Sequence, residues 1–148
     1  RSSDLKLPAN GGRALRAYMQ LVGACVEECA ADEHRQFIAP PLKRALDDLQ
    51  GATGWLMRNA LMKPDNAAAG SMAYLHLMGL VALGHQWALM IKAAQGALAR
   101  QPADTAFYEH KLTVGRYYFS HVICETAVHR ARVEAGAEAM MALAAEAF

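Results

Sequence analysis

Apolar residues recur at intervals of three and four along most of this chain, the spacing that places them on one face of an α-helix. The pattern predicts four main helices, at about 13–32, 41–62 and 67–100, with the fourth beginning near Thr105. Residues from Glu125 onward are also helix-prone and are predicted as a C-terminal helical tail, with a break or a close contact at Gly136. The pattern therefore predicts a helical chain throughout these segments.

Short proline-marked connections separate the predicted helices. Pro40 and Pro41 precede the second helix, Pro64 precedes the third, and Pro102 precedes the fourth, where Asp104 is a candidate N-cap. Connections this short place sequential helices antiparallel. The predicted fold is all-α, an up-down antiparallel bundle of about four main helices with the C-terminal helical tail.

The third predicted helix is apolar on nearly all sides between Met72 and Ile91, which is long enough to cross a bilayer. However, His76, His85 and Gln86 lie at mid-span, where polar side chains are costly in lipid, and the flanks show no charge asymmetry. We therefore predict the central helix of a bundle and no membrane span, with membrane association as an alternative.

Length and composition indicate one domain. The chain has 148 residues, of which 54% are hydrophobic, and alanine outnumbers valine, isoleucine and threonine together, as expected of a helical protein. Residues 1–12 are predicted to be a tether or entry loop, and residues 13–148 a single helical-bundle domain. The chain begins at Arg1 rather than Met, with no secretory leader, so we expect a fragment of a longer parent chain.

Charge and cysteine content exclude some partners and compartments. The formal net charge of +1 argues against nucleic-acid binding, which usually needs a basic patch. Three cysteines cannot all pair, so a disulfide framework is not expected. We therefore expect a reducing, cytoplasmic location.

Two groups of residues have metal-ligand spacing. Cys25 and Cys29 share one helix face, but no second ligand pair follows nearby, and buried cysteine is common in cores. His121, Glu125 and His129 align if the helix continues through Cys124, although neighbouring arginines would repel a cation. We predict no metal site, and no nucleotide-binding loop or catalytic constellation is present in the sequence.

Three segments, in this order, resemble the C-terminal domain appended to a branch of bacterial acyl-CoA dehydrogenases. The first runs from Ala73 to Met90, the second is FYEHKLTVGRYYF at 107–119, and the third is AGAEAMMAL at 135–143. One departure is Ile123-Cys124, where the family tends to have Leu-Pro. Without that proline the fourth helix is able to run on, so whether it breaks near Cys124 is left open.

The resemblance implies a parent flavoenzyme that holds FAD and oxidises an acyl-CoA thioester to the 2,3-enoyl-CoA in fatty acid metabolism. A glutamate base and the flavin perform that reaction in parts of the parent that lie outside this chain. We therefore assign no catalytic residue and predict that this segment alone is inactive and binds no cofactor. The implied partners are the dehydrogenase core, the acyl-CoA substrate and further copies in a homo-oligomer.

The aromatic and basic character of the fourth helix predicts its role. We expect an accessory bundle that packs on the core, shapes subunit contacts or covers part of the acyl-CoA cleft. The predicted interface residues are Lys111, Arg116, Tyr117 and Tyr118. The alternative is a free-standing helical interaction or metal-binding module.

Overall fold

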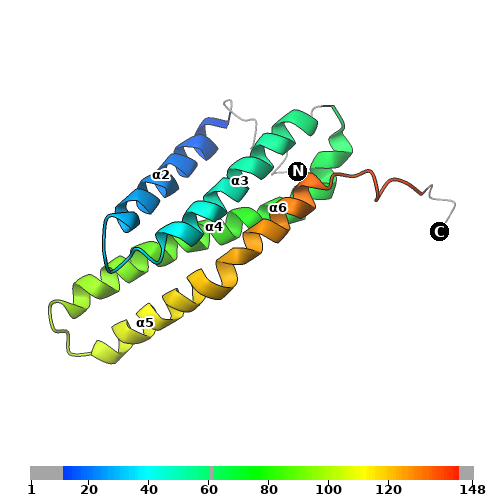
Figure 1. The fold of residues 1–148 in the computed structure, drawn as a ribbon. Coiled ribbons are helices and arrows are strands. Elements are labelled where there is room, and N and C mark those ends of the chain that lie inside the picture. The colour runs from blue at the N-terminus through cyan, green and yellow to red at the C-terminus, as the bar shows by residue number, and fades with distance from the viewer. Residues whose placement is uncertain (1–11, 61, 144–148) are drawn as a thin grey trace.

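The computed structural model describes residues 12–60 and 62–143, and helices are the only regular secondary structure in that part of the chain. The predicted tether at 1–12 lies outside the described residues, apart from Gly12. The helices form an elongated bundle (Figure 1). Their bounds are α2 at Arg13–Ala30, α3 at Ala39–Asn59, α4 at Pro64–Leu98, α5 at Thr105–Tyr117 and α6 at Thr126–Glu134.

The order of the helices confirms the predicted up-down arrangement. Helices α2, α3 and α4 each form one rod, and α5 and α6 together form the fourth. Successive rods run antiparallel (Figure 1). Pro40 and Pro41 lie in the first turn of α3 and Pro64 begins α4, where a missing N–H costs nothing. The Asp104 carboxylate caps α5 as predicted, since it accepts a hydrogen bond from Phe107 N at 3.0 Å.

The long helix α4 is the central element of the bundle. It contacts α2, α3, α5 and α6, and Leu77, Val81 and Ile91 are fully buried on its inner side. Gly84 allows close packing, because a Cβ there would lie 2.8 Å from Ile123 Cδ1 and 3.1 Å from Leu42 Cδ1. Of the described helices, α4 is the one whose length and composition would suffice to cross a membrane.

The fourth rod is continuous past Cys124, so the break that the sequence left open does not occur. A π-helical turn at Tyr118–Val122 and a 3₁₀ turn at Ile123–Glu125 join α5 to α6. These turns change the helical register locally and bring Ile123 into the core, where it is 1% exposed.

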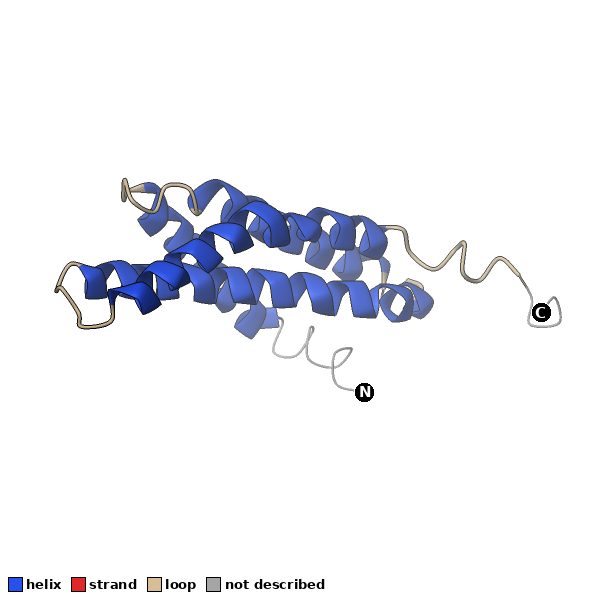
Figure 2. Ribbon diagram, turned by 90° about the horizontal axis from the view of Figure 1, so that it is seen from below, coloured by secondary structure: helices blue, strands red, loops and turns tan. Residues whose placement is uncertain are grey.

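The predicted helical tail is shorter than expected. Helix α6 ends at Glu134, Gly136 adopts a left-handed φ of 67°, and 137–143 continue as turns and bends that leave the bundle (Figure 2). Gly136 is required there, because φ is positive and Asn66 Oδ1 and Trp55 would lie 3.0 and 3.3 Å from a Cβ. The apolar residues Met140, Met141 and Leu143 are more than 60% exposed, so they anchor nothing within the bundle.

Candidate functional site

Tyr118 belongs to the core and not to an exposed interface, contrary to the prediction. It is 6% exposed, its hydroxyl donates to Leu80 O at 2.6 Å, and its ring stacks on Trp87 with centroids 6.3 Å apart. Burial raises the pKa of its hydroxyl to about 12. Tyr118 therefore binds the fourth rod to α4 and is not available to a partner.

Lys111 contacts an aromatic ring of its own helix, α5. Its Nζ atom is 5.3 Å from the centroid of the Phe107 ring, a cation–π distance. Phe107, Lys111, Val114 and Tyr118 follow one another at spacings of four, three and four, so they form one row along the helix. Tyr118 at one end of this row is buried against α4, whereas Phe107 and Val114 are 51% and 49% exposed.

Arg116 and Tyr117 lie on other sides of the same helix. The Arg116 guanidinium is 4.3 Å from the centroid of Phe37 and lines a cleft of about 640 Å³ with Phe37 and Gln95. Tyr117 is 57% exposed and stacks on the His121 ring with centroids 4.7 Å apart.

The four predicted interface residues therefore do not share one surface. Lys111 and Arg116 are five positions apart, which separates them by roughly 140° around a helix. The sequence pattern did not distinguish the buried Tyr118 from the exposed Tyr117, because two adjacent tyrosines give no signal for which of them faces α4.

The cysteine pair is part of the core. Cys25 and Cys29 are 8% and 0% exposed, and burial raises the pKa of both thiols, that of Cys29 to about 11. Protonated thiols are poor metal ligands and poor nucleophiles, so these two side chains serve packing.

The predicted strip of His121, Glu125 and His129 is divided by the π-turn. His121 bonds Ser120 Oγ through Nδ1 at 2.6 Å, whereas His129 is buried with its ring against His76, centroids 5.2 Å apart. Burial, with His76 and Arg132 nearby, lowers the pKa of His129. Across 12–60 and 62–143, no three His, Cys, Asp or Glu side chains are grouped so that they could hold one metal ion.

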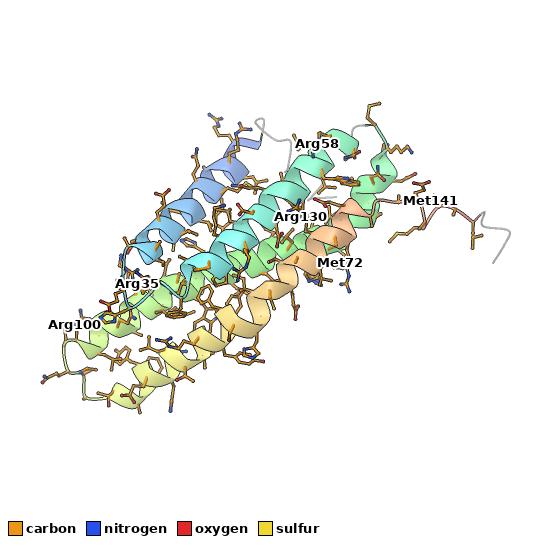
Figure 3. The ribbon with its side chains drawn as sticks, viewed as in Figure 1. Arg35, Arg58, Met72, Arg100, Arg130 and Met141 are labelled. Carbon is orange, nitrogen blue, oxygen red and sulfur yellow. The ribbon has the colours of Figure 1, made fainter. Side chains whose placement is uncertain are left out.

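An ion-pair network occupies the acidic C-terminal end of α2. Arg35, only 7% exposed, donates from Nη1 to Glu28 at 3.0 Å and from Nε to Asp32 at 2.8 Å (Figure 3). Lys92 of α4 donates to the same Glu28 oxygen at 2.6 Å. These cations offset the unfavourable position of acids at a helix C-terminus and connect α2 to α4.

The network predicts an acid-dependent stability. Bonds from Lys92 and Arg35 lower the pKa of Glu28, and the bond from Arg35 lowers that of Asp32. A carboxylate whose folded-state pKa is lowered stabilises the fold above its unfolded pKa, and this contribution is lost as pH falls through the folded value. We expect E28Q/D32N to lower the urea midpoint of unfolding at pH 7. We also expect the midpoint of this variant to decrease less steeply than that of the wild type as pH drops below about 4. The control is E33Q, and an equally steep acid fall in E28Q/D32N would contradict the assignment.

One cleft, of about 830 Å³, does not fit the pyrophosphate of a flavin nucleotide. It lies between the α3–α4 connection and the segment after α6, and its lining includes Trp55, three carboxylates and one lysine. A pyrophosphate needs positive charge or clustered N–H donors, whereas Asp65, Glu134 and Glu138 repel it. We therefore derive no reaction step within the described residues.

The comparisons with known proteins define the family. Residues 14–144 match the family described as acetyl-CoA dehydrogenase C-terminal like, so the chain belongs to this family of C-terminal acyl-CoA dehydrogenase domains. A similar protein is the 3-methylmercaptopropionyl-CoA dehydrogenase of Ruegeria pomeroyi (strain ATCC 700808 / DSM 15171 / DSS-3). It is 28% identical over 129 residues, which are 86% of this chain and 22% of that protein. The chain thus spans about a fifth of the length of the curated relative it matches.

Proposed function

We propose that the chain is the C-terminal accessory helical domain of an FAD-dependent acyl-CoA dehydrogenase, a cytoplasmic oxidoreductase that converts an acyl-CoA thioester to the 2,3-enoyl-CoA. The observation that carries the proposal is the family match over residues 14–144, together with a relative named as a CoA dehydrogenase, of which the matched segment is 22%. When bound in the longer protein, FAD supplies the hydride acceptor. This segment contributes no reacting group.

The proposed role of the segment is packing on the dehydrogenase core, subunit contact or covering of the acyl-CoA cleft. Exposed Tyr and Arg side chains are enriched where proteins contact one another. Tyr117 and Arg116 have this character, and Lys111 adds a positive charge beside Phe107 on the same helix. Tyr118 is not included, because it is buried.

The flavin content of two purified proteins tests the proposal. The first is the product of the whole reading frame that contains residues 1–148, and the second is the 148-residue chain alone. We expect a visible flavin spectrum in the first and none in the second, because the proposed FAD site lies in parts of the longer protein outside the 148-residue chain. Flavin bound stoichiometrically by the 148-residue chain, or no flavin in the whole product, would contradict the proposal.

A further inference from the structure

A pair of histidine rings joins α6 to α4. His129 of α6 is 8% exposed, and its ring lies at 81° to the ring of His76 of α4, with centroids 5.2 Å apart. The Nδ1 atom of His129 is buried and finds no hydrogen-bond partner within the described chain. Because a buried charge without a partner is costly, this contact accommodates a neutral imidazole better than a protonated one.

The surroundings of His129 oppose a positive charge on its ring. Burial is the main cause of the lowered pKa of His129, and His76 of α4 and Arg132 of α6 lower it further. Glu125, one turn earlier in the fourth rod, acts in the opposite direction but does not offset these effects. The ring therefore takes up a proton more readily when it has left this contact.

The start of α6 is anchored to α3. Thr126, which is 2% exposed, donates from Oγ1 to Asp48 Oδ2 at 2.9 Å, and Arg130 Nη1 lies 3.6 Å from the other oxygen of that carboxylate. Asp48 is thus engaged by two side chains of α6. These α3 contacts hold the first turn of α6, and neither of them requires His129 to be neutral.

A possible pivot for α6 directly precedes this anchor. The π-helical turn at Tyr118–Val122 and the 3₁₀ turn at Ile123–Glu125 interrupt the α-helical hydrogen bonding of the fourth rod. A 3₁₀ stretch inside a long helix often marks a hinge. Beyond the hinge, the far half of α6 is held on α4 by His129 and by Val133, which packs over Gly70.

From these observations we infer that the His129–His76 pair is an acid-sensitive latch. When the pair takes up a proton, the far half of α6 and the segment after it separate from α4, while α2, α3, α4 and α5 stay packed. The movement widens the cleft of about 830 Å³ that residues 134–138 form with the α3–α4 connection. The latch consists of residues of this chain alone, so it holds whether or not the proposed dehydrogenase activity is correct.

Proton uptake sets the direction of the effect. In the latched state the pKa of His129 is lowered, whereas in the open state the solvated ring has its ordinary pKa of about 6.5. The open state therefore binds more protons as pH falls below about 6.5. One proton raises the opening constant by up to about tenfold for each pH unit, until the latched ring is protonated as well.

Hydrogen exchange of the 148-residue chain at about pH 7.5 and about pH 5.5, corrected for the intrinsic exchange rate, tests the latch. At the lower pH we expect the amides of α6 to lose protection by roughly threefold to tenfold, and those of α3 by less than about twofold. H129Q keeps a neutral polar side chain and is expected to abolish the loss in α6. H110Q is the matched control, because His110 is exposed on α5, and it is expected to respond like the wild type.

Titration of the histidine rings by NMR provides a second readout on the wild type, which is needed where H129Q does not fold. His129 is expected to be half-protonated below about pH 6.5. His85, the other buried histidine in the described part of the chain, packs on Tyr18 of α2, so its protonation would expose α2 and not α6. Equal loss of protection in α2 or α3, an unchanged loss in H129Q, or half-protonation of His129 at or above about pH 6.5 would overturn the inference.

Discussion

Replacing Leu77 by alanine is expected to lower the free energy of unfolding by about 3 kcal/mol, within the range of large-to-small core substitutions. Leu77 is fully buried at the centre of α4, the helix that contacts every other rod. The loss combines the transfer free energy of the missing methyl groups with the cavity that they leave. For a domain of this size each kcal/mol shifts Tm by roughly 2–4 °C, so the effect is readily measured by thermal or urea unfolding.

The matched control is L75A, two residues away on the same helix. Leu75 is 62% exposed, so the same substitution is expected to change stability by less than about 0.5 kcal/mol. Comparable losses in L77A and L75A would show that the inner and outer sides of α4 have been assigned wrongly.

Two glycines of α4 are expected to respond in opposite directions to one substitution. G84L is expected to destabilise by about 1–3 kcal/mol, because its side chain would enter space occupied by Ile123 and Leu42. G79L is expected to stabilise the monomer by about 0.8 kcal/mol, since leucine has the higher helix propensity and the space around Gly79 is open.

Urea unfolding of both glycine variants measures this contrast. The variants share helix, residue type and change in volume, so the difference between them isolates packing of α4 against Ile123 of the fourth rod and Leu42 of α3. A stability gain in G84L would contradict the close approach of Ile123 to α4.

Much of the fold is predictable from the sequence, because local signals are strong where the chain turns. Pro64 and the capping pair Asp104-Thr105 begin α4 and α5 within a few residues of the expected positions. The apolar spacing of α4 indicated a central helix, which the structure confirms. The tail beyond Gly136 was predicted as helix from composition alone, and there helix propensity without packing is insufficient.

The candidate site was less predictable, since it depends on contacts between distant residues. The acidic cluster at the end of α2 has no local explanation in the sequence, because one of its cations, Lys92, is 64 positions from Glu28. The burial of Tyr118 depends on which side of α5 packs on α4, and the exposure of Leu83 depends on which side of α4 the other rods cover. A helix that is apolar all round gives no signal for that side.

The most direct test of the central claim is the acyl-CoA-dependent reduction of an electron acceptor by the product of the whole reading frame, assayed beside the 148-residue chain. The account predicts formation of 2,3-enoyl-CoA by the whole product and none by the 148-residue chain, which has the sequence of a C-terminal domain of this family. Turnover by the 148-residue chain itself, or a whole product that oxidises no acyl-CoA thioester across a range of chain lengths, would contradict it.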